Sequence, residues 1–137
     1  MIKETLRIGR WVVDFLFCKG RYDIDGVLGC LYDAHAPWKV MADAEDLMRS
    51  CEHNCGFTYS NGYFKRAVVL IGPASSGDEF ANTLSHEIHH LAVAIAKSIG
   101  YDLDGEAPAY LAGDTTMALI KTICEFGCDK CNYKNVQ

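Results

Sequence analysis

This sequence of 137 residues contains few prolines, no excess of positive charge and no long apolar run. With three prolines, no Pro/Ser-rich tract and no internal repeat, we expect one domain spanning residues 1–137. The formal net charge is −5 and no segment gathers basic and aromatic residues on one face, which argues against a nucleic-acid partner. No apolar run has the length of a membrane span, which argues against a membrane partner.

The start of the chain also lacks the features of an export signal. Residues 11–17 form a short apolar run, but Asp14 interrupts it and no small-x-small cleavage site follows. We therefore expect an amphipathic helix in this region and a cytoplasmic protein.

The chain has seven cysteines, a high and odd number, and no export signal is expected. In that setting cysteines are expected as thiols and not as a disulfide framework. The alternative is a structural zinc ion held by four thiolates, those of Cys51, Cys55, Cys128 and Cys131. The seven cysteines are Cys18, Cys30, Cys51, Cys55, Cys124, Cys128 and Cys131.

Residues 40–71 predict a helix followed by a β-hairpin. Apolar residues recur every three or four positions over 40–53, which is typical of an amphipathic helix. Residues 56–60 and 63–71 read as two strands around Asn61-Gly62, a dipeptide that tolerates the positive φ angles of a tight turn.

Two further helices are expected in the second half of the chain. Ser76 followed by Glu79 is a capping-box pattern that begins a helix running to about Ile99, and Gly100 is suited to end it. A last helix is expected over about 106–126, with Pro108 tolerated in its first turn. Together with the hairpin these helices predict an α+β fold.

The helix over 76–99 carries the motif His-Glu-x-x-His at residues 86–90. Histidines four residues apart lie one helical turn from each other, so His86 and His90 can both reach one tetrahedral zinc ion. Glu87 lies between them, where a carboxylate can take a proton from a water molecule that zinc has made more acidic. The motif also fits a structural role for the histidines, but its position on a helix and off the apolar stripe favours a metal site.

This combination of a hairpin, a helix with His-Glu-x-x-His and a following helix resembles the zincin metallopeptidases over about residues 56–115. The resemblance implies a small sheet packed on the active-site helix and on the helix after it. It also implies Zn²⁺ as the cofactor and a peptide or protein as the substrate. In zincins the strand before the active-site helix commonly lies at the sheet edge and pairs with substrate. Here residues 63–71 would take that role or form a buried strand.

The third zinc ligand follows from the gluzincin branch, which takes it from a glutamate on the next helix. Glu106, in Glu106-Ala107-Pro108-Ala109-Tyr110, resembles that element. The alternatives are Asp102, Asp104 and Asp114, or a role for Glu106 in stabilising a helix N-terminus. Val93 and Ala96 stand where the metzincin branch has its glycine and third histidine, which excludes that branch.

Two functions stay open at this point: a zinc-dependent peptidase with Glu87 as the general base, and a non-catalytic, metal-stabilised interaction module of zincin-like fold. Only the first requires Glu87. A domain of this size would lack one wall of a zincin cleft, which a dimer or a partner protein could complete.

Overall fold

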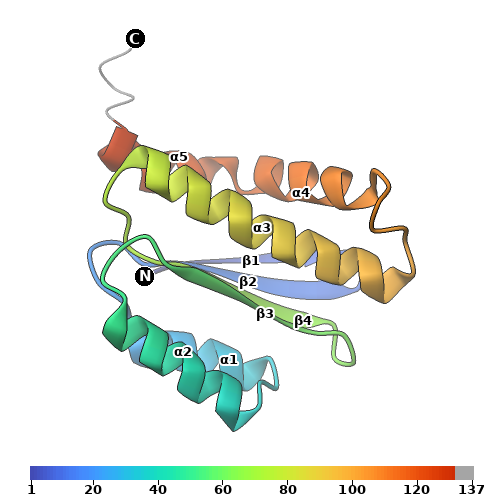
Figure 1. Ribbon diagram of the computed structural model, residues 1–137, viewed down its shortest axis with the longest axis horizontal. Coiled ribbons are helices and arrows are strands. Elements are labelled where there is room, and N and C mark those ends of the chain that lie inside the picture. Colours follow the sequence, from blue (N-terminus) through green and yellow to red (C-terminus); the bar gives the residue numbers. More distant parts are fainter. Residues whose placement is uncertain (132–137) are drawn as a thin grey trace.

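The computed structural model describes the backbone of residues 1–131 and the side chains of residues 1–127. In this part of the chain a four-stranded sheet packs between two layers of helices, with α1 and α2 on one face and α3, α4 and α5 on the other (Figure 1). The predicted α+β class is confirmed. Within these residues no helix is both long and apolar enough to cross a membrane.

The sheet has the order β1-β2-β4-β3, so β3 forms one of its edges. The pairs β1–β2 and β3–β4 are antiparallel, whereas β2 and β4 are parallel. The chain leaves the sheet after β2, forms α1 and α2, and returns as β3 at the outer edge. The strands are β1 (Ile2–Ile8), β2 (Trp11–Phe17), β3 (Gly56–Asn61) and β4 (Arg66–Ile71).

The helix expected around residues 11–17 is wrong, because the chain begins as the β1–β2 hairpin. Side chains of β1 alternate between half-buried and exposed, as expected for a strand with one covered face. In contrast, β2 is covered on both faces and therefore reads as a continuous apolar run. Asp14 is tolerated inside it because Thr5 Oγ1 donates a 2.7 Å hydrogen bond and Arg66 lies 3.7 Å away.

Two apolar clusters fill the two faces of the sheet. The cluster under α3, α4 and α5 is built on Phe15 and Phe17 of β2, and the cluster under α1 and α2 is built on Leu16 and Leu70. The helices of the second face are α1 (Ile24–Asp33), which was not predicted, and α2 (Trp38–Ser50), which agrees with the expected helix over 40–53.

The hairpin predicted over 56–71 is confirmed, but its turn is longer than expected. Asn61 pairs with Arg66, so four residues connect the strands instead of the Asn61-Gly62 dipeptide alone. The Asn61 side chain accepts hydrogen bonds of 3.1 Å from the backbone N–H groups of Tyr63 and Phe64, and Lys65 takes the positive φ. An asparagine side chain that imitates a backbone turn explains this difference.

The helix α3 (Gly77–Ile99) matches its prediction closely. The Ser76 hydroxyl accepts a 3.1 Å hydrogen bond from the Glu79 N–H, and Gly100 ends the helix with φ 81°. The single helix expected over 106–126 is instead α4 (Ala107–Ala118) and α5 (Ile120–Cys131), which meet at Leu119. Leu119 is fully buried in the core at this junction.

The expectation that the cysteines are thiols is wrong for one pair, because Cys51 and Cys55 form a disulfide. This bond uses two of the four sulfurs that a four-thiolate zinc site would need, and the side chains of Cys128 and Cys131 lie outside the described residues. Cys18 and Cys30 are free and buried, and burial raises the pKa of both thiols.

Candidate active site

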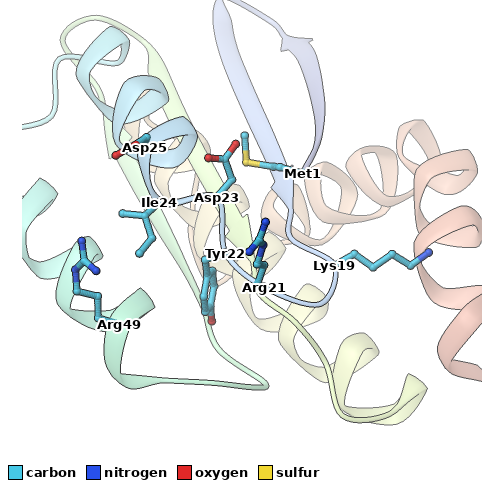
Figure 2. Close-up of a pocket in the computed structure, with 8 residues that line it drawn as sticks. All are labelled: Met1, Lys19, Arg21, Tyr22, Asp23, Ile24, Asp25 and Arg49. Atoms are coloured by element: carbon cyan, nitrogen blue, oxygen red, sulfur yellow. The ribbon is translucent and has the colours of Figure 1, made fainter.

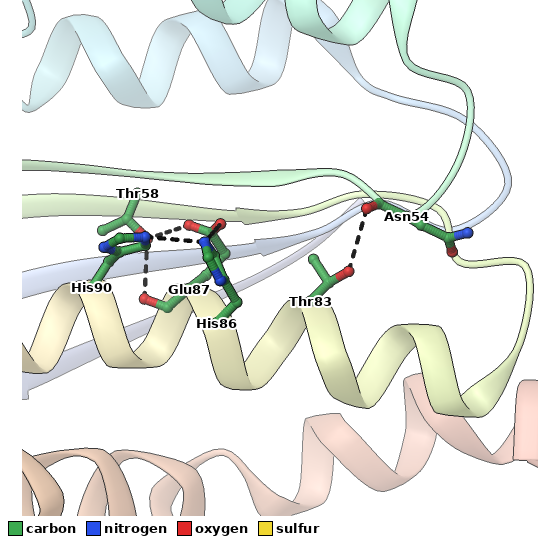
Figure 3. Close-up of polar contacts among 6 residues, drawn as sticks. All are labelled: Asn54, Thr58, Thr83, His86, Glu87 and His90. Atoms are coloured by element: carbon green, nitrogen blue, oxygen red, sulfur yellow. Dashed lines mark hydrogen bonds and ion pairs between the residues drawn. The ribbon is translucent and has the colours of Figure 1, made fainter.

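The His-Glu-x-x-His motif lies in the middle of α3, beside the apolar stripe that packs on the sheet. The predicted stripe of Phe80, Leu84, Ile88, Leu91 and Ile95 is buried throughout. Because this stripe holds one side of α3 against the sheet, the motif residues fall on the adjoining side, toward β3. In Figure 3 the side chains of His86, Glu87 and His90 project from the helix toward the strands.

The two imidazole rings converge on one point. His86 Nε2 and His90 Nε2 lie 3.0 Å apart, with the ring planes at 78° to each other. Two nitrogens that bind one tetrahedral zinc ion at its usual bond length are about 3.3 Å apart. A small opening of the pair would therefore fit zinc, and His86 is exposed enough to admit it.

Glu87 points into the space between α3 and the sheet and is only 5% exposed. Its carboxylate Oε2 accepts a 2.7 Å hydrogen bond from the Thr58 hydroxyl on β3, and its Oε1 lies 4.0 Å from His86 Nε2. The carboxylate thus lies between the histidine pair and the edge strand (Figure 3). Burying a carboxylate costs free energy unless the carboxylate is hydrogen-bonded, and the Thr58 hydroxyl supplies that hydrogen bond.

A cavity of about 370 Å³ opens beside these residues and is lined by Glu87, His90 and four residues of β3: Gly56, Phe57, Thr58 and Ser60. A larger hollow of about 580 Å³ at the start of α1 is lined by charges of both signs, among them Arg21, Asp23 and Arg49 (Figure 2). It contains no motif residue, so the cavity beside α3 is the candidate site.

The backbone of β3 adds hydrogen-bonding groups to the same cavity. Gly72 N–H donates to the Cys55 carbonyl, so alternate β3 residues starting from Cys55 bond to β4. The residues between them, Gly56, Thr58 and Ser60, therefore point their N–H and C=O groups toward the free edge of the sheet. In the described part of the chain no strand lies beyond β3.

The strand predicted for the sheet edge, residues 63–71, is therefore not the strand found there. Residues 66–71 form β4, which lies between β2 and β3 and is buried, whereas β3 is the strand at the edge. The second possibility named for residues 63–71, a buried strand, is the one observed.

Glu106 is the predicted ligand that the structure does not bring to the histidines. It lies at the N-terminal boundary of α4, where its carbonyl accepts from Tyr110 N–H and its side chain makes no capping hydrogen bond. Among the described residues no three His, Cys, Asp or Glu side chains are grouped closely enough to hold a metal ion. The assignment of Glu106 as third ligand stays a prediction, as do its alternatives.

The alternatives to Glu106 lie in the loop before α4 or on α4 itself. Asp102 Oδ1 accepts a 3.0 Å hydrogen bond from Asp104 N–H in the exposed loop before α4, and Asp114 is exposed on α4 itself. His89, the third histidine of the motif segment, is exposed and contributes no nitrogen to the pair.

Thr58 is the residue of this site that sequence analysis missed. The signal that could have found it is the run Gly56-Phe57-Thr58-Tyr59-Ser60, in which small residues alternate with aromatic ones. Such alternation puts Gly56, Thr58 and Ser60 on one face of a strand. The register shows that this face is the one toward α3, because Thr58 pairs with Val69 of the α3-side cluster.

Comparisons with protein-family models, with curated protein sequences and with solved structures found no match to this chain.

Proposed function

We propose that this protein is a zinc-dependent peptidase in which His86 and His90 bind the metal and Glu87 is the general base. One observation carries the proposal: a buried carboxylate lies beside two converging imidazole nitrogens and borders a cavity at a free strand edge. A purely structural histidine pair would need neither the buried Glu87 nor the cavity.

The residues present fit zinc in their chemistry. Imidazole nitrogens are common zinc ligands, and an anionic third ligand from Glu106 would complete a set typical of catalytic sites with one position open to water. When bound, zinc supplies a Lewis acid that polarises a carbonyl and makes water more acidic.

The role of Glu87 follows from its position between α3 and β3. Its carboxylate accepts the proton of the water that attacks the peptide carbonyl, and then passes this proton to the departing amine. Because Glu87 is largely buried, little competing water contacts its carboxylate. Electrostatic interactions between the carboxylate and the reacting groups are therefore stronger than they would be in bulk water.

The substrate class follows from β3. A peptide in extended conformation can add to a free strand edge through main-chain hydrogen bonds. Gly56, Thr58 and Ser60 present such groups along the cavity that contains Glu87 and His90. Their small side chains leave room for the side chains of the bound peptide.

The setting of the enzyme is part of the same proposal. We infer a cytoplasmic protein without a nucleic-acid or membrane partner, acting on peptides or proteins. A second copy or a partner protein would complete the far wall of the cleft.

Replacing Glu87 by Gln tests the proposal most directly. The amide keeps the size of the side chain but cannot take a proton, so peptide hydrolysis should fall roughly a hundredfold or more. Zinc content and thermal stability should stay near those of the unchanged protein, because Glu87 is not proposed as a ligand. Activity is measured on a broad peptide library, with and without a chelator.

Glu79→Gln, an exposed change in the first turn of the same helix, is the matched control and should cleave normally. Equal cleavage by the Glu87→Gln variant would remove Glu87 from the mechanism. No cleavage by the unchanged protein across the library would favour the non-catalytic interaction module.

A further inference from the structure

Thr58 contacts the proposed base at two points. Its hydroxyl oxygen lies 2.7 Å from Glu87 Oε2 and 3.1 Å from the Glu87 backbone carbonyl (Figure 3). A threonine hydroxyl has one proton to donate, and a bond to an ionised carboxylate is shorter and stronger than one to a neutral carbonyl. The shorter contact therefore receives the proton.

This hydrogen bond fixes the direction of a flexible side chain. Within the described residues, the Thr58 hydroxyl is the one hydrogen-bond donor to the Glu87 carboxylate, and His86 Nε2 lies 4.0 Å from the other carboxylate oxygen. A glutamate has three side-chain torsions, so burial alone does not select one position for its carboxylate. The Thr58 hydroxyl does so, because it anchors one oxygen at the edge strand.

We propose that Thr58 is the positioning residue of Glu87, an inference that rests on the proposed peptidase function. The same residue directs its backbone N–H and C=O toward the free edge of the sheet. A peptide paired with β3 would thus be held by the main chain of Thr58 while the side chain of Thr58 holds the base. One residue thereby sets the distance between the peptide bond to be cut and Glu87.

Thr58→Val is the primary test, because valine keeps the branched shape and removes the hydroxyl. We expect kcat to fall roughly 10- to 100-fold, the weight of one hydrogen bond to a charged group. KM should change little, because the backbone groups of residue 58 stay in place. Thr58→Ser, which restores the hydroxyl, should recover most of kcat.

Thr83→Val is the matched control. Thr83 lies one helical turn before Glu87 on α3, and its hydroxyl makes only a 3.5 Å contact with the Asn54 carbonyl. Each variant is also checked for zinc content and for cooperative thermal unfolding. If Thr58→Val does not fold, Thr58→Ala replaces it, with Thr58→Ser as before.

Crystal structures of the unchanged protein and the Thr58→Val variant give a readout that is independent of activity. We expect the Glu87 carboxylate to leave its place beside residue 58 in the variant, with zinc content unchanged. An unmoved carboxylate, an unchanged kcat, or a rise in KM alone would overturn the inference. If the unchanged protein cleaves no peptide, the proposed function fails, and the carboxylate position alone decides whether Thr58 positions Glu87.

Discussion

At the scale of single residues, the burial of Glu87 is the most informative feature of the protein. A glutamate at 5% exposure gives up hydration that folding must replace, and the structure replaces it with the Thr58 hydroxyl. An apolar residue at this position would pack between α3 and β3 without such a requirement. Departures from simple burial rules tend to lie at functional sites, which agrees with Glu87 as the base.

Gly56 makes the close approach of α3 to β3 possible. A Cβ atom at this position would lie 3.0 Å from Thr83 Cγ2 and 3.1 Å from Glu87 Cγ, and it would also crowd the Leu70 carbonyl. We expect Gly56→Ala to lower the free energy of unfolding by about 1–3 kcal/mol, the usual effect of overpacking. It should also lower peptide hydrolysis, because Glu87 must shift.

Chemical denaturation and peptide cleavage measure these two effects. Gly113→Ala on α4 is the control, because a Cβ atom there meets no atom within 4 Å. That change should leave stability equal or slightly higher, since alanine favours a helix. The explanation of Gly56 would be contradicted by equal stability of both variants.

At the scale of elements, the edge position of β3 determines how a substrate could bind. The strand is held by β4 on one side and packs against α3, so within the described residues its other edge is free to pair with an extended chain. The elements that hold the motif are regular and well packed, whereas the segment that contains Glu106 is a loop joined to a helix start.

Main-chain pairing predicts a specific sensitivity in the substrate. For a peptide that is cleaved, N-methylation of one backbone amide near the cleaved bond removes a donor to the Gly56, Thr58 or Ser60 carbonyl. We expect kcat/KM to fall roughly 3- to 10-fold for each amide that is paired, the weight of one neutral hydrogen bond. A series with the methyl group moved along the peptide should show alternating loss, since only every second amide faces β3. A uniform or absent effect would contradict pairing along β3.

Glu106, the predicted third ligand, lies at the N-terminal boundary of α4. Glu106→Gln removes an anionic ligand but keeps its volume, so zinc should bind roughly tenfold or more weakly while the fold is kept. Zinc affinity is measured by competition with a chelating dye. Glu125→Gln, an exposed change on α5, is the control. Affinity unchanged by Glu106→Gln would transfer the assignment to Asp102, Asp104 or Asp114.

At the scale of the whole molecule, the proposed metal site lies outside both apolar clusters. Neither cluster includes His86 or His90, and the two clusters fill the faces of the sheet without them. We therefore expect the fold to form without a metal ion, unlike that of a zinc finger.

From this we predict that the purified chain binds about one zinc ion and stays folded when a chelator removes it. Far-UV circular dichroism should be unchanged, and Tm should fall by the few degrees that loss of a bound ligand causes. Elemental analysis and thermal unfolding check both parts. Unfolding upon chelation would favour a metal-stabilised module, and a chain that neither carries nor takes up zinc would refute the metal site.

Local patterns were sufficient for the features that depend on neighbours in the sequence. The helix α3, its Ser76 cap, its Gly100 end and the 86–90 motif all follow from residues within a few positions of one another. So do the β3–β4 hairpin and the α+β class, because helical and strand periodicities differ. The ligands His86 and His90 and the role of Glu87 are predictions from this local spacing, whereas the third ligand, Glu106, is a prediction from the resemblance to gluzincins.

Only the tertiary structure decided which strands are neighbours. The run over residues 11–17 looks apolar enough for a helix, and it is a strand because both of its faces are covered by residues distant in sequence. The same long-range pairing made β3 the edge and β4 an inner strand, and it brought Thr58 within 2.7 Å of Glu87. Periodicity fixes the face on which a side chain lies, whereas its partner depends on the packing of the whole chain.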